Sequence, residues 1–148
     1  MKSFRRILFA TDFSPASARA FDEAVALTGT AGAELTIVHV YQPPALFPAD
    51  FPVSPAVYDE LETKLREDAE SGLANLAAEA CRRGVRAQFL LLVGFADQAI
   101  AEAAREGKAD LVVVGTHGRT GVRRLLLGSV ASRVITAAPC PVMTVPAA

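Results

Sequence analysis

The stretch from Asp110 to Val130, which reads DLVVVGTHGRTGVRRLLLGSV, decides how the chain folds. Its apolar run Leu111–Val114 is typical of a buried strand, and a glycine-rich loop follows from Gly115. The pair Gly128-Ser129 then opens a helical pattern. Glycine lets backbone approach a ligand closely, and a helix N-terminus offers unpaired N–H groups at its positive dipole end. A strand, a glycine loop and a helix start together therefore predict an anion site, most naturally for phosphate.

The spacing of the loop separates it from better-known phosphate motifs. Gly115, Gly118, Gly128 and Ser129 form the pattern G-x2-G-x9-G-S. A P-loop needs Lys after its last glycine, and the dinucleotide motif G-x-G-x-x-G needs a glycine where this chain has His117. A purely structural interpretation stays open, in which the glycines only permit a tight surface turn.

Five apolar segments along the chain predict strands, and helical patterns separate them. The expected strands are Arg6–Thr11, Glu34–Val40, Arg86–Val93, Asp110–Gly115 and Pro141–Val145. Alternating strands and helices predict an α/β fold, with a parallel sheet covered on both faces and right-handed crossovers. Four of the strands are too apolar for a sheet with one face in water, which agrees.

The natural arrangement is a single doubly wound domain, residues 1–148, with a five-stranded sheet in the order 3-2-1-4-5. Its switch point falls between the first and fourth strands, where ligands bind at the carboxyl ends. Those ends carry Thr11-Asp12 and Gly115-Thr116-His117-Gly118.

Capping residues predict where the helices begin and end. Ser14 is a good N-cap before Pro15, and Gly29 and Gly32 offer the stop of the first helix. Ser54-Pro55 starts a long second helix, from about Ala56 to Arg83, with Gly84 after its end. Gly72 interrupts the middle of this pattern, which slightly weakens the prediction of a continuous helix. Two shorter helices are expected over Ala96–Glu106 and Ser129–Ala137.

A proline-rich segment runs from Tyr41 to Pro55 and holds five of the nine prolines, so it is neither helix nor central strand. It starts at the carboxyl end of the second strand. It could therefore form a wall or a lid of the site, and a passive surface loop is the equal alternative.

Bulk properties exclude several classes of protein. No apolar run approaches the ~20 residues of a membrane span, and the N-terminal apolar run is too short for a signal peptide. Cys81 and Cys140 are isolated and fit inert thiols in a reducing cytoplasm, and with two histidines they are too few for a zinc site. A net charge of −1 gives no footprint for nucleic acid. We expect a cytoplasmic protein with neither membrane nor nucleic acid as a partner.

A local basic group lies inside the glycine loop, made by Arg119, Arg123 and Arg124. A solvated arginine face is the default interpretation, and contact with phosphate is its competitor. Arg119 is favoured for that contact because it directly follows Gly118.

The glycine spacing, the opening ILFATDFS (residues 7–14), the second strand IVHV (37–40) and the closing PCPVMTV (139–145) carry a resemblance. Through them nearly the whole chain resembles the universal stress protein family, and in particular its ATP-binding branch. In that family the glycine loop wraps the ribose and phosphates of a bound nucleotide. The resemblance implies ATP as the ligand, with or without Mg²⁺, and leaves any metal unknown.

The resemblance also implies roles for individual residues. Asp12 would contact the ribose or a metal–phosphate group, and the backbone of Val40 would meet the adenine. Phosphates and ribose would be held by backbone amides, with one further donor from the Ser129 hydroxyl; these are the amides of Gly115, Gly118, Gly128, Ser129 and Val130.

Each of these residues has an alternative role. Asp12 could orient the turn before Ser14, and Ser129 could be the N-cap of the last helix. His117 could bind a phosphate or lie solvated. Thr11 and Thr116 are expected to line the site, whereas His39 on its apolar strand is interpreted as a hydrogen-bonded core residue.

The leading function is an adenine-nucleotide-binding stress-response protein with a signalling or protective role. The family resemblance implies a homodimer joined through Val142–Val145, an apolar edge strand that needs cover, although a monomer with a covered edge is the alternative. No side chain is a convincing general base, so ATP hydrolysis would be slow at most, and the protein partner is unknown. The alternatives are a nucleotide-free scaffold of the same fold and a nucleotide hydrolase or transferase.

Overall fold

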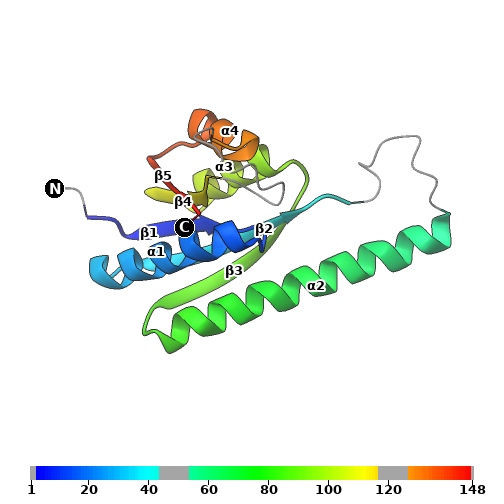
Figure 1. Ribbon diagram of the computed structural model, residues 1–148, viewed down its shortest axis with the longest axis horizontal. Coiled ribbons are helices and arrows are strands. Elements are labelled where there is room, and N and C mark those ends of the chain that lie inside the picture. Colours follow the sequence, from blue (N-terminus) through cyan, green and yellow to red (C-terminus); the bar gives the residue numbers. More distant parts are fainter. Residues whose placement is uncertain (1–2, 44–53, 117–126, 148) are drawn as a thin grey trace.

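The structure is a computed structural model that describes residues 3–43, 54–116 and 127–147 (Figure 1). Strands and helices alternate along the chain. Their bounds are β1 Arg6–Ala10, α1 Pro15–Ala31, β2 Glu34–Tyr41, α2 Pro55–Arg82, β3 Arg86–Val93, α3 Ala96–Glu106, β4 Leu111–Gly115, α4 Ser129–Ala137 and β5 Val142–Val145.

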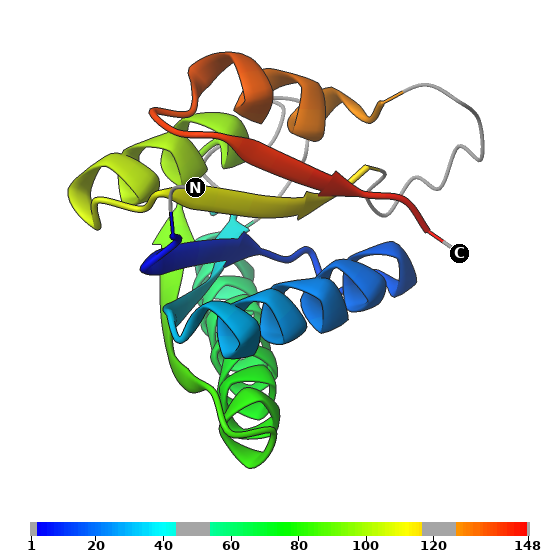
Figure 2. The same cartoon turned by 90° about the vertical axis from the view of Figure 1, so that its left-hand side faces the viewer.

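The five strands form one parallel sheet in the order β3-β2-β1-β4-β5, as predicted. Helices α1 and α2 cover one face, and α3 and α4 cover the other (Figure 2). The chain is therefore doubly wound, and the expected fold class is confirmed. The strand order reverses at β1, which has β2 on one side and β4 on the other.

The central strand β1 explains the continuous apolar runs in the sequence. Ile7 and Phe9 face the core under α1 and α2, whereas Leu8 faces the core under α3 and α4. All three side chains are at most 3% exposed. A strand covered on both faces needs apolar residues at every position, which removes the usual alternation.

The helix ends follow the capping residues closely. The Ser17 amide donates to Ser14 Oγ at 3.2 Å, so Ser14 caps α1 as predicted. The helix runs through Gly29 and stops at Gly32, whose φ of 64° is left-handed. Ser54 caps α2 in the same way.

The prediction of one continuous helix across Gly72 is confirmed. The helix passes through it without a break, and a Cβ built there would lie 2.8 Å from the ring of Phe13. Phe13 itself has a left-handed φ of 61°, which few non-glycine residues adopt. Gly72 is therefore the site where α2 accepts the aromatic side chain of the turn after β1.

The expectation of burial is wrong for β3. This strand lies at the edge of the sheet, and its Leu90 and Val93 side chains are 47% and 53% exposed. Helix α2 packs against the other face of β3, where Ala87 and Leu91 join the core. On the face of Leu90, α3 packs Ile100 and Ala104 against Leu8 of β1 and covers the edge strand only in part. The apolar content of a strand shows that it can be buried, but the placement of the neighbouring helices determines whether it is buried.

We predict opposite effects for two Gly→Ala substitutions in helices. Gly29→Ala should raise the free energy of unfolding by about 0.5–1 kcal/mol, because alanine favours the helix and its Cβ would meet Val85 at an ordinary 3.7 Å. Gly72→Ala should lower the free energy of unfolding or leave it unchanged. The added Cβ forces the ring of Phe13 to move, and this overpacking costs about 1–3 kcal/mol, which offsets the gain in helix propensity. Urea denaturation measures the free energy of unfolding of both variants.

The control is the same substitution without the aromatic ring. In a Phe13→Ala background, Gly72→Ala should stabilise the helix as Gly29→Ala does. Equal stabilisation by Gly29→Ala and Gly72→Ala in the parent chain would refute the packing role of Gly72.

Candidate functional site at the carboxyl ends of β1 and β4

The carboxyl ends of β1 and β4 lie side by side at the switch point of the sheet. Ile7 pairs with Leu111 and Phe9 with Val113, in parallel register. The chain beyond β1 therefore leaves the same edge of the sheet as Gly115 and Thr116 beyond β4. This edge is where ligands bind in doubly wound folds.

The start of α4 is tied to the end of β4 by a hydrogen bond. The Gly128 amide donates to the Thr116 carbonyl at 2.6 Å, and the Thr116 amide donates to the Val145 carbonyl at 3.0 Å. The first turn of α4 is thereby fixed at the carboxyl edge of the sheet.

Gly128, and not Ser129, is the N-cap of α4. Ser129 is the first helical residue, so the capping role considered for it is wrong. No side chain of a described residue caps this helix. Because the first amides of a helix have no acceptor within it, the amides of Ser129 and Val130 are suited to an external acceptor such as phosphate.

Asp12 shapes the turn that leads from β1 into α1. Its Oδ1 accepts a hydrogen bond from the Ser14 amide at 2.9 Å, as in an Asx turn. The structural role considered for Asp12 is therefore real. It is compatible with ligand contact, because a carboxylate has about four lone-pair sites on two oxygens.

Thr11 is a buried part of the same turn. Its hydroxyl lies 2.9 Å from Ser17 Oγ and accepts a hydrogen bond from the Phe13 amide at 2.9 Å. Thr11 is only 7% exposed and helps to hold the turn, and its predicted place in the lining of the site stays a prediction. Ser17 and Phe13 are participants that the sequence analysis did not single out, and no sequence signal distinguishes them from other helix and turn residues.

His39 is a satisfied core histidine, as predicted. It is 9% exposed, and its Nδ1 lies 2.7 Å from the Thr11 carbonyl. The ring of Phe13 packs on it with a centroid distance of 4.5 Å. The pair braces the turn that carries Asp12.

Val40 lies near the end of β2, the strand between β1 and β3. It pairs in register with Leu92 of β3. It is half-buried and packs with the core under α3 and α4, on the face of the sheet that α4 covers. Three predicted ligand residues, His117, Gly118 and Arg119, lie outside the described residues, as do Arg123, Arg124 and the middle of the proline-rich segment (44–53).

Two further features concern the whole described part of the chain. Among these residues, no three His, Cys, Asp or Glu side chains gather closely enough to hold a metal ion. No helix within the described ranges is long and apolar enough to cross a membrane.

The sequence pattern of the universal stress protein family matches residues 3–146. The chain belongs to the universal stress protein family. A universal stress protein of Thermus aquaticus is 39% identical over 142 residues, which cover 96% of this chain and 98% of the relative.

Solved structures of related proteins share the fold over almost their whole length. The structure of MJ0577, a universal stress protein of Methanocaldococcus jannaschii, has a TM-score of 0.84 at 27% identity and covers 98% of this chain and 97% of that one. A universal stress protein in complex with cAMP has a TM-score of 0.73, also at 27% identity, and covers 99% of this chain and 100% of the other.

We predict that the turn after β1 distinguishes two substitutions of Asp12. Asp12→Ala removes the acceptor for the Ser14 amide and should cost about 0.5–1.5 kcal/mol of unfolding free energy. Asp12→Asn keeps an acceptor oxygen at the same position and should cost much less. Urea denaturation of both variants measures the difference, and an equal loss in the two would show that the turn does not depend on this hydrogen bond.

Proposed function

We propose that this universal stress protein binds an adenine nucleotide, ATP, at the carboxyl ends of β1 and β4, and acts as a homodimeric signalling or protective module. The observation that carries the proposal is the first turn of α4. Its amides have no side-chain cap among the described residues, and the Gly128–Thr116 hydrogen bond holds them at the switch point.

The described residues fit a phosphate group at this position. The N-cap is glycine, so no Cβ stands between the helix end and a ligand. Ser129 and Val130 are both exposed, and the Ser129 hydroxyl does not cap the helix. The positive dipole end of α4 favours a negative charge there, and the favourable interaction is worth about 0.3–1 kcal/mol for a surface group.

The nucleoside would lie toward β1 and β2. In the proposed complex the Asp12 carboxylate accepts hydrogen bonds from ribose hydroxyls or holds a magnesium–phosphate group, and the Val40 backbone meets the adenine. Gly115, Gly118, His117 and Arg119 complete the phosphate end. The cAMP complex of a related universal stress protein supports an adenine nucleotide as the ligand class.

We assign the protein a binding role in preference to a catalytic one. In the described part of the site, the one carboxylate is that of Asp12, and it already orients the turn before Ser14. A general base needs reach to a water or hydroxyl in line with the reacting phosphate, and nothing described supplies a second one. Hydrolysis of ATP is therefore slow at most.

The homodimer is proposed to form at β5. This edge strand has four residues, and Pro141 before it cannot donate a backbone hydrogen bond. Val142, Met143 and Thr144 are only half-buried. Pairing with the same strand of a second copy would cover the edge. One domain over residues 1–148 is part of this proposal, supported by the family match over 3–146.

A negative charge at the start of α4 should separate nucleotide binding from stability. Ser129→Glu places a carboxylate in the first turn, which favours the helix dipole but repels phosphate. We expect unchanged or higher thermal stability and at least about tenfold weaker binding of Mg-ATP, which corresponds to about 1.4 kcal/mol. Isothermal titration calorimetry with ATP, ADP and AMP measures the affinities. The parent protein should bind more tightly as the number of phosphates rises, and the variant should lose this preference.

The matched control is Ala56→Glu, which adds the same charge to the exposed first turn of α2. It should leave nucleotide binding unchanged. Tight ATP binding by Ser129→Glu would place the phosphates elsewhere. Failure of the parent protein to bind any nucleotide would instead favour the nucleotide-free scaffold.

A further inference from the structure

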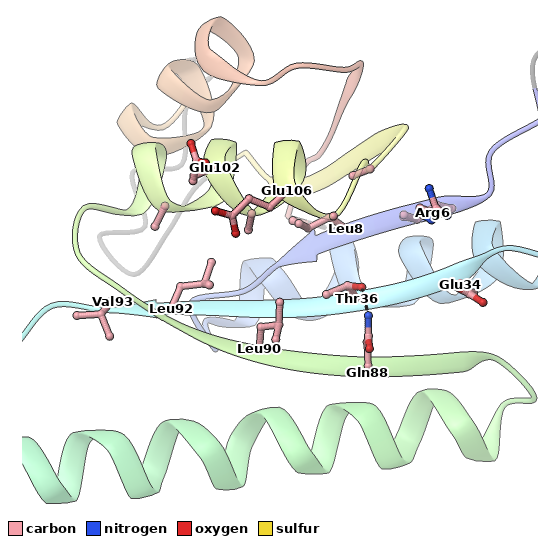
Figure 3. Close-up of a pocket in the computed structure, with 15 residues that line it drawn as sticks. Arg6, Leu8, Glu34, Thr36, Gln88, Leu90, Leu92, Val93, Glu102 and Glu106 are labelled. Atoms are coloured by element: carbon pink, nitrogen blue, oxygen red, sulfur yellow. Dashed lines mark hydrogen bonds between the residues drawn. The ribbon is translucent and has the colours of Figure 1, made fainter.

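A groove of about 500 Å³ lies between α3 and the part of the sheet formed by β2 and β3 (Figure 3). It shares no residue with the proposed nucleotide site. It exists because α3 packs its buried residues Ile100 and Ala104 against Leu8 of β1, so that this helix covers the edge strand β3 only in part. The groove is consequently open along the β3 edge.

The floor of the groove is apolar. Leu90 and Leu92 of β3 point toward α3, and Ala99 and Ala103 of the helix line the opposite wall. Leu90 and Val93, which both line the groove, are 47% and 53% exposed. Exposed apolar surface that is continuous and bordered by polar groups marks an interaction site more often than chance exposure does.

The rim of the groove is acidic. Glu102 and Glu106 of α3 lie one helical turn apart above the floor (Figure 3). Glu34 lies toward the other end and is paired with Arg86 at 3.4 Å, so the acidic part of the rim is on α3. Arg6 is the one cationic side chain among the lining residues. Glu102 pairs with Arg105 at 2.6 Å in an exposed pair, whereas Glu106 forms no ion pair with any described residue. Exposed ion pairs contribute little to stability, so a partner's cation can replace Arg105 at little cost.

We propose that this groove docks a basic amphipathic helix of a partner protein. Apolar side chains of that helix enter between α3 and β3, where the small Ala99 and Ala103 allow close approach. Its Lys or Arg residues, one turn apart, pair with Glu102 and Glu106, because side chains at i and i+4 lie about 5–6 Å apart on a helix. The chemistry is that of helix-in-groove recognition with complementary charge.

The geometry favours this occupant over a small molecule. The missing wall at the β3 edge leaves a small ligand half in water, whereas a helix supplies that wall itself.

The test uses the full-length protein and three labelled synthetic peptides of about 20 residues, long enough to form a helix. The first has a leucine stripe flanked by lysines at i and i+4, the second has glutamates in place of the lysines, and the third is a scrambled first peptide without amphipathicity. Fluorescence anisotropy gives the affinities. We expect the first peptide to bind at least about tenfold more tightly than the other two, a difference of about 1.4 kcal/mol.

Variants then locate the site. Leu90→Ser should weaken binding of the first peptide about tenfold, and Glu102→Gln with Glu106→Gln should weaken it about three- to tenfold at low salt, with little effect at high salt. The control pair, Glu23→Gln with Glu67→Gln, removes two exposed charges from α1 and α2 on the opposite face of the sheet and should change nothing. Ser129→Glu should also bind the peptide normally, which keeps this test independent of nucleotide binding.

Several outcomes would overturn the proposal. Equal binding of the scrambled peptide would show general attraction to positive charge. Unchanged affinity in both groove variants would place the peptide elsewhere on the molecule. A lower sedimentation coefficient for Leu90→Ser than for the parent protein would make the groove an interface between copies of this chain.

Discussion

The burial of β1 on both faces is the constraint on which the rest of the structure depends. Ile7 and Phe9 enter one core and Leu8 enters the other, so helices must pack on both sides of this strand. Parallel strands must also return to the same end of the sheet through helical crossovers. The chain therefore reverses its direction of winding at β1, and the ends of β1 and β4 meet at one edge. The nucleotide site is proposed at this edge, where the turn after β1 lies near the first amides of α4.

The turn after β1 is held by hydrogen bonds and by aromatic packing. The Phe13 amide donates to the Thr11 hydroxyl and the Ser14 amide donates to Asp12 Oδ1, and Phe13 packs between His39 and Gly72 of α2. A left-handed φ at an aromatic residue is strained, and it persists only where the surroundings compensate for it. Such a turn holds the Asp12 carboxylate in place before any ligand arrives. Preorganisation of this kind reduces the entropy that binding must overcome.

The sequence alone predicts the order of the elements and the sheet topology, because alternating apolar and helical patterns leave few right-handed solutions. It also predicts the caps at Ser14 and Ser54. It does not predict that β3 is exposed, since Leu90 has the composition of a buried strand and only the placement of α3 leaves it uncovered. Nor does it place the N-cap of α4 at Gly128 in place of Ser129, because glycine and serine are both good caps. The partnership of Phe13 with Gly72 joins residues far apart in the chain and has no local signal.

Native mass spectrometry of the protein, purified without added nucleotide and then titrated with Mg-ATP, tests the central claim most directly. Acid release identifies any small molecule that was carried through purification. The account predicts a dimer that carries ATP or ADP, or that takes up one ATP per chain on titration. A protein that binds no nucleotide at saturating Mg-ATP would contradict the account. The first turn of α4 would then have only a structural role, in a nucleotide-free scaffold.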